Sequence, residues 1–161
     1  PGCTIRDLIY KINSADSIDH LKSIISDSAI PKSQKKVLKE IASSSALDRT
    51  SREALARKLV EFEEEKMDKT LSQTDTITRV GPTLGLMGTL IPMGPGLAAL
   101  GVGDVNTLAE SLTVAFNTTI VGIGSGALCY VVSKVRRGWY ERYLSDLDAL
   151  SDAVLSYMNN S

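Results

Sequence analysis

The sequence predicts an all-α membrane protein, in which a transmembrane helical hairpin carries cytoplasmic helical segments. Two observations lead to this prediction. Residues 80–103 and 111–133 form runs of 24 and 23 residues without a charged side chain, and each run exceeds the roughly 20 residues that a helix needs to cross a hydrocarbon core. The sequences on either side instead repeat apolar residues at helical spacing between charged residues.

The overall composition excludes several classes of protein. The chain has 161 residues, with 18 basic and 19 acidic side chains and a net charge of -1. It therefore lacks the basic excess that nucleic-acid binding requires. Its two cysteines have no paired spacing and His20 is the single histidine, so we expect no disulfide framework, no metal site and no cofactor.

We expect residues 1–78 to form a cytoplasmic region of short amphipathic helices. One of them carries Ile18, Leu21, Ile24 and Ile25 along a single face. Helix starts are predicted at residues whose side chains can cap backbone N–H groups: Thr4, Asp16, Ser33 and Thr50, the last paired with Glu53 in a capping box.

The two uncharged runs predict transmembrane helices at 79–104 and 105–135, followed by a cytoplasmic C-terminal helix at 136–161. Arg79 precedes the first run, and basic residues from Lys134 to Arg137 follow the second. Lysine and arginine favour the cytoplasmic side of short membrane loops. We therefore expect a multi-pass protein of the inner or cytoplasmic membrane, with both flanking regions cytoplasmic and the link around Asp104 outside.

Several residue types refine this picture. Pro82, Pro92 and Pro95 predict a kinked or interrupted first transmembrane helix. Aromatic residues beside the basic cluster suit a membrane interface; they are Trp139, Tyr140 and Tyr143. The C-terminal tail repeats apolar residues at alternating steps of three and four, which suits packing either against a neighbouring subunit or against its own chain.

Small residues in the uncharged runs predict close helix packing. Helices in lipid gain little from the hydrophobic effect against each other, so small side chains that let backbones approach are favoured at their contacts. The candidates for helix packing recur at helical spacing in both runs: Gly85, Gly88, Ala115, Gly122 and Gly126.

A second face of the later run is polar. It carries Glu110 near the outer end and Asn117 about two turns deeper. Polar groups at that depth normally face a bundle interior or a watery path. Thr118 and Thr119 add hydroxyls near the same level, and Thr89 is the hydroxyl of the first run. A threonine hydroxyl can, however, bond its own helix carbonyl and serve only packing.

Two motifs in these runs resemble those of the MotA/TolQ/ExbB proton-channel family. The stretch Pro82-Thr-Leu-Gly-Leu-Met-Gly-Thr89 resembles the family's Pro-x-Leu-Gly-Leu-x-Gly-Thr signature. The stretch Ala115-Phe-Asn-Thr-Thr119, followed by Gly122, is similar to its Ala-Leu-x-Thr-Thr-x-x-Gly motif. The resemblance covers about residues 79–137.

The resemblance implies a subunit of a proton channel complex that converts ion flow into motion or energy transduction, and not an enzyme. It implies a homo-pentamer around two single-pass partner helices of the ExbD, TolR or MotB type. Thr89 and Thr119 would then line the pore and meet the partner's proton-carrying aspartate. The implied proton pathway comprises Thr89, Thr119, Thr118, Asn117 and Glu110.

The chain departs from the family pattern in two ways. Val114 stands where the ExbB and TolQ branch has a glutamate, and Glu110 lies one turn outward on the same face. Whether Glu110 replaces that glutamate stays open. The family also has a transmembrane helix before its cytoplasmic segment, and we expect that helix to precede Pro1.

A second hypothesis comes from a different class of protein. The chain could be a pore-forming or scaffold protein with an apolar hairpin and no proton coupling, as in colicin-like toxins. The interfacial aromatic and basic residues, the small-residue stripes and the threonine motifs favour the proton channel, because a toxin hairpin needs none of them.

Overall fold

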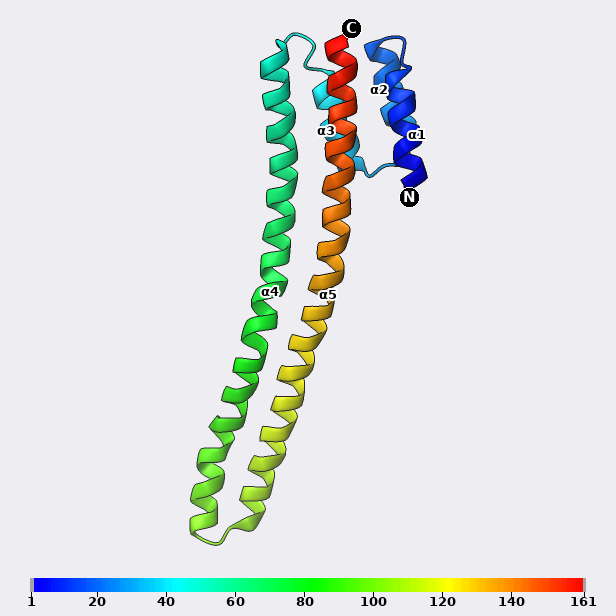
Figure 1. Ribbon diagram of the computed structural model, residues 1–161. Helices are drawn as coiled ribbons and strands as arrows, with labels where there is room; N and C mark the ends of the chain where they lie inside the picture. The colour runs from blue at the N-terminus through cyan, green and yellow to red at the C-terminus, as the bar shows by residue number, and fades with distance from the viewer. Residues whose placement is uncertain (1, 161) are drawn as a thin grey trace. The chain divides into compact units, whose positions relative to one another are not determined.

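The computed structural model describes the backbone of residues 2–160 and the side chains of residues 4–160. Over that range every regular element is an α-helix, which confirms the predicted all-α fold (Figure 1). The helices are α1 (Gly2–Asn13), α2 (Ile18–Asp27), α3 (Lys32–Ala42), α4 (Arg49–Gly101) and α5 (Val105–Asn160). Helices α4 and α5 are each long and apolar enough to cross a membrane. Cys129 is unpaired, whereas the side chain of Cys3 lies outside the described residues.

The chain divides into two compact units. The helical unit comprises Pro1–Met67 and Trp139–Ser161, and the hairpin unit comprises Asp68–Gly138. Both long helices continue from one unit into the other, so the predicted boundaries at 78 and 136 fall inside continuous helices.

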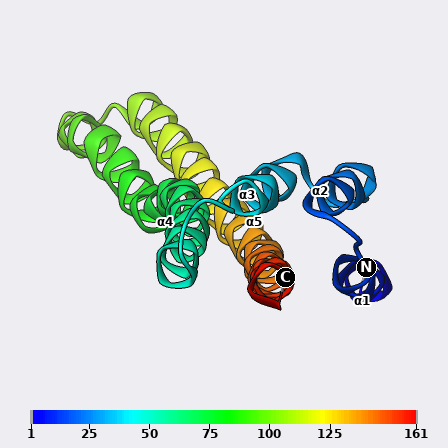
Figure 2. The same cartoon turned by 90° about the horizontal axis from the view of Figure 1, so that it is seen from above.

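The helical unit encloses one hydrophobic core. Figure 2 shows α1, α2, α3 and the C-terminal end of α5 arranged around it. Apolar residues spaced three and four apart place one face of each helix inward. The side chains with no exposed surface are Ile12, Leu21, Ile25, Leu38, Ile41, Leu147, Leu150 and Val154.

The C-terminal tail therefore packs on its own chain. Leu147, Leu150 and Val154, three members of the predicted seam, are fully buried among residues of α1 to α3. Tyr143 is also held within this unit: its hydroxyl hydrogen-bonds Ser33, and the Gln34 amide donates to its carbonyl oxygen at 3.0 Å. Burial raises the pKa of Tyr143 above its ordinary value.

None of the four predicted caps is confirmed: Thr4 lies inside α1, and the other three are wrong by one or two residues. Ser17, and not Asp16, caps α2 by accepting a bond from the His20 N–H. Asp48 takes the place predicted for Thr50, because its carboxylate accepts from the Ser51 N–H at 3.3 Å. Hydrogen bonding to Ser51, mainly to its side chain and less to its backbone, lowers the pKa of Asp48. Helix α3 follows Pro31 without a side-chain cap. Before α2 and α4 several polar residues stand in a row, and the sequence does not decide which one adopts the capping geometry.

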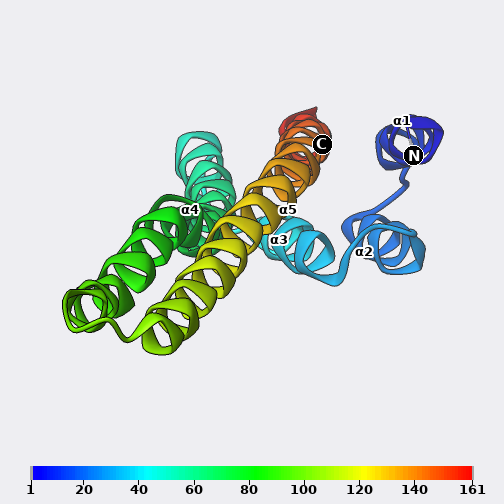
Figure 3. The same ribbon diagram turned by 90° about the horizontal axis from the view of Figure 1, so that it is seen from below.

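In the hairpin unit the two helices run antiparallel and are joined by a tight turn (Figures 1 and 3). Gly103 has a φ of 80°, a conformation that glycine adopts without strain. Asp104 follows it, and its carboxylate accepts bonds from the N–H and the hydroxyl of Thr107 in the first turn of α5.

The prolines do not interrupt α4. The helix continues through Pro82, Pro92 and Pro95 to Gly101, so of the two expected outcomes the interruption is wrong, and the kink stays a prediction. Prolines are tolerated in membrane helices where neighbouring groups or water satisfy the carbonyls that lose their helical partners.

Glycines hold α4 and α5 close together within the hairpin unit. A methyl group added at Gly122 would lie 2.7 Å from the Cα of Gly85, and one added at Gly126 would lie 3.1 Å from Cδ of Pro82. A methyl group at Gly88 would lie 2.0 Å from the methyl carbon of Thr118. At Gly122 the added methyl group would meet backbone, so no other residue type fits there without moving a helix. At Gly88 and Gly126 it would meet a side chain, which would have to shift.

We expect Gly122→Ala to destabilise the hairpin by about 1–3 kcal/mol, because the new methyl meets backbone that cannot move aside. Gly124→Ala is the matched control, since nothing lies within 4 Å of the methyl it adds. Thermal unfolding in detergent, followed by circular dichroism, measures both. Equal melting temperatures for the two variants would show that the helices can separate at no cost.

Candidate functional site

The glycine contacts set the register of the hairpin. Gly85 lies against Gly122, Gly88 against Thr118, and Gly96 against Ser111. In this antiparallel register Thr89 comes level with Thr118 and Thr119. We call Thr89, Asn117, Thr118 and Thr119 the polar layer, because they share one depth along the hairpin.

The threonine hydroxyls of the polar layer bond to their own helices. Thr89 donates to the Leu86 carbonyl at 2.6 Å. Thr118 donates to Val114 at 2.8 Å, and Thr119 donates to Ala115 at 2.9 Å. Each hydroxyl oxygen still has lone pairs that can accept a bond from water or from a protonated acid.

The members of the polar layer that belong to α5 lie on two different surfaces of that helix. Thr118 faces α4, with its methyl group against Gly88, and the neighbouring Ala115 is only 5% exposed. Asn117 lies on a face that α4 leaves uncovered. The structure therefore brings the threonines and Asn117 to one depth but does not join them by a hydrogen bond within residues 2–160.

The uncovered face of α5 carries the other predicted polar residue. Glu110 is exposed there, seven residues before Asn117 and thus about 10 Å further out. Val114 and Val121 complete this face and are 53% and 69% exposed. In the single chain the face is apolar with two polar groups, which suits a surface that meets another helix and water.

Sequence reasoning missed a polar contact between the helices. Ser133, which is only 3% exposed, donates to Asp75 at 2.5 Å, and Arg137 bonds the second carboxylate oxygen of Asp75 at 3.0 Å. The contact lies where the uncharged run of α5 ends. Asp75 stands near the start of the uncharged run of α4. In an antiparallel hairpin the start of one run lies beside the end of the other, so the sequence positions of Asp75 and Ser133 could have predicted this contact.

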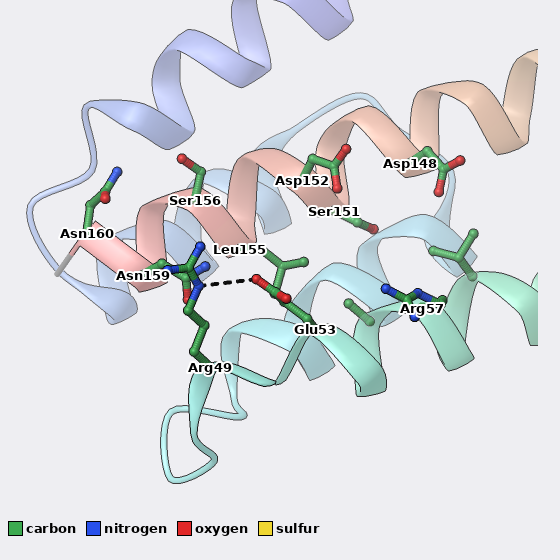
Figure 4. A pocket seen from close by; sticks show the side chains of 12 residues that line it. Arg49, Glu53, Arg57, Asp148, Ser151, Asp152, Leu155, Ser156, Asn159 and Asn160 are labelled. Atoms are coloured by element: carbon green, nitrogen blue, oxygen red, sulfur yellow. Dashed lines mark hydrogen bonds and ion pairs between the residues drawn. The ribbon is translucent and has the colours of Figure 1, made fainter. Parts of the chain in front are cut away.

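A separate cavity of about 510 Å³ lies in the helical unit, between the start of α4 and the end of α5 (Figure 4). Arg49 bonds Glu53 at 3.3 Å on one side of it. The buried hydroxyl of Ser151 lines it and has no hydrogen-bond partner in the described part of the chain. This cavity contains none of the residues predicted for the functional site.

Comparison with known families agrees with the motif resemblance. The model of the MotA/TolQ/ExbB proton channel family matches residues 25–149, which include the hairpin and α3. No curated protein and no solved structure gives a match.

The contact of Thr118 with Gly88 leads to a prediction about packing. Thr118→Val keeps the methyl group and removes only a hydroxyl that bonds its own helix, so we expect little change in stability. Thr118→Ser removes the methyl group and should cost about 1 kcal/mol, because it leaves a void against Gly88. Unfolding of both variants in detergent tests this; a larger loss for the valine variant would mean that the hydroxyl, and not the methyl group, holds the helices.

Proposed function

Since the chain belongs to the MotA/TolQ/ExbB proton channel family, we propose that it is the channel subunit of a complex that couples proton flow to motion or energy transduction. Several copies, five by analogy with the family, would surround a single-pass partner that supplies a proton-carrying aspartate. The family match disfavours a toxin-like hairpin without proton coupling.

One observation carries the proposal: Asn117 is exposed in the middle of an uncharged run, on a face that α4 leaves uncovered. A carboxamide facing hydrocarbon would be costly, so the face calls for a partner or water. Val114 and Val121 flank Asn117 and make most of that face apolar, as expected where another helix packs.

The glycine contacts restrict where protons could pass. Gly85 and Gly122 leave no room for a methyl group between the helices, and hence none for a file of water. A path would therefore run outside the hairpin, along the uncovered face of α5. On that face the amide of Asn117 is the polar-layer group that could stabilise a partner's carboxylate. Thr119, two residues on and about 200° round the helix, could do so only from the other side of α5.

Glu110 fits the outer mouth of this path. It lies about 10 Å from Asn117 towards the turn and is exposed, so its carboxylate can attract cations without entering the apolar layer. We propose membrane spans at 79–104 and 105–135, which put Glu110 near the end that joins them.

Topology gives the first test. We expect a cysteine at Asn106 to react with an impermeant maleimide added to the outer side of the membrane, because the basic residues flank only the opposite ends of the hairpin. The labelling uses full-length protein in which serine replaces Cys3 and Cys129. A cysteine at the exposed Ser72 is the control and should react only from the cytoplasm. The reverse pattern would contradict the orientation.

Proton flux gives the second test. Thr→Val keeps the shape of the side chain and removes its hydroxyl. We expect Thr89→Val with Thr119→Val to lower flux by about tenfold or more for each lost hydroxyl, since a hydrogen bond to a charged group is worth about 1.5–3 kcal/mol. The measurement is flux into vesicles that hold the complex with its partner, with assembly checked by mass photometry.

The matched control for flux is Thr78→Val. Thr78 lies on α4 before the uncharged run and bonds its own Thr74 carbonyl at 3.0 Å, so it is outside both the polar layer and the uncovered face of α5. We expect it to conduct normally and Glu110→Gln to have a smaller effect than the double variant. Normal flux in an assembled double variant would leave the threonines as packing residues only.

A further inference from the structure

A cavity of about 260 Å³ lies in the hairpin unit, at the end away from the turn. Its wall is formed by α4 residues from Asp68 to Arg79 and by Arg137 of α5. Arg79 directly precedes the uncharged run 80–103, so this cavity lies where the hairpin enters the membrane, at the depth of lipid headgroups.

Charge along the wall of this cavity is ordered by distance from the membrane. Arg79 comes first, Asp75 and Ser72 lie one and two turns further away, and Asp68 is the most distant. Steps of three and four residues put these side chains on one face of α4. Arg137 lies at the level of Asp75 and forms an ion pair with it, so the wall is positive at Arg79, balanced at the Asp75–Arg137 pair and negative at Asp68.

The groups that line the cavity have bonding capacity left. The Arg79 guanidinium makes no hydrogen bond or ion pair within the described residues 2–160. Asp75 accepts one bond from Ser133 and one from Arg137, whereas an ionised carboxylate can accept about four. Asp68 is exposed and adds negative potential at the far end.

We propose that this cavity binds the headgroup of a phospholipid that carries a primary ammonium, such as phosphatidylethanolamine. The phosphate, which is next to the acyl chains, bonds Arg79. The ammonium, which points away from the membrane, donates to Asp75 and to the hydroxyl of Ser72, with Asp68 beyond it. The order of charges in the headgroup matches the order of charges in the wall.

The neighbouring surface favours a lipid over a soluble phosphate ester. Val80 and Leu84 follow Arg79 on α4 and are 42% and 57% exposed, which provides an apolar surface for acyl chains. An anionic headgroup without an amine would place its outer end beside two aspartates. A choline headgroup has no N–H to donate to them.

The proposal depends on the membrane placement of the hairpin and not on proton conduction, so a binding measurement tests it separately from flux. The purified complex is placed in phosphatidylcholine nanodiscs that contain small amounts of phosphatidylethanolamine or phosphatidylglycerol. Native mass spectrometry then counts the lipids retained. We expect phosphatidylethanolamine to be retained about tenfold over either other lipid, equal to about 1.4 kcal/mol.

Arg79→Gln and Asp68→Asn test the two ends of the site, because neither side chain has a partner whose loss would unfold the chain. Both should reduce the preference for phosphatidylethanolamine. Arg136→Gln is the matched control: Arg136 is an exposed arginine near the same end of the hairpin, but it does not line the cavity. It should keep the preference.

Soluble phosphoethanolamine separates a lipid site from a site for free phosphate esters. We expect millimolar phosphoethanolamine to leave the retained lipid unchanged. Displacement of the lipid would overturn the lipid assignment, as would equal retention of the three lipids by the wild-type complex. Loss of the preference in Arg136→Gln to the same extent as in Arg79→Gln would show general attraction to basic residues and would also overturn it.

Discussion

The contact of Gly85 with Gly122 is the constraint on which the hairpin unit depends. Both residues lack a side chain, so dispersion contacts between the backbones replace the hydrophobic effect that lipid does not provide. The contact fixes the antiparallel register and thereby brings Thr89 level with Thr119. It also decides which face of α5 is covered and which is left for Asn117.

The close packing of α4 and α5 determines where the polar groups of the hairpin lie. Because the interface of the hairpin is filled, polar chemistry is moved to its outside, where Asn117 and Glu110 lie. Under the proposed function, a single copy would offer one wall of the path, and other chains would supply the remaining walls. Exposed apolar residues such as Val121, costly in a soluble monomer, are expected on such a surface.

Most of the hairpin could be predicted from the sequence, because long uncharged runs with small residues at helical spacing are typical of packed membrane helices. The seam through Leu150 was recognised as apolar, but only the packed helices decided between its own chain and a neighbour. The contact of Asp75 with Ser133 was not predicted, since it joins residues 58 positions apart and neither belongs to a motif. The caps were misplaced because runs of polar residues such as Asp48 to Ser51 offer several equivalent choices.

The three prolines of α4 mark where the hairpin needs hydration. Each proline lacks an N–H, so the carbonyls four residues earlier, those of Thr78, Gly88 and Ile91, lose their helical donor. In hydrocarbon an unmet carbonyl is expensive, and water or a neighbouring chain must supply the missing donor. The carbonyl of Gly88 is one residue from Thr89, at the depth of the polar layer. The backbone of α4 therefore adds an acceptor of its own there, independent of any side chain.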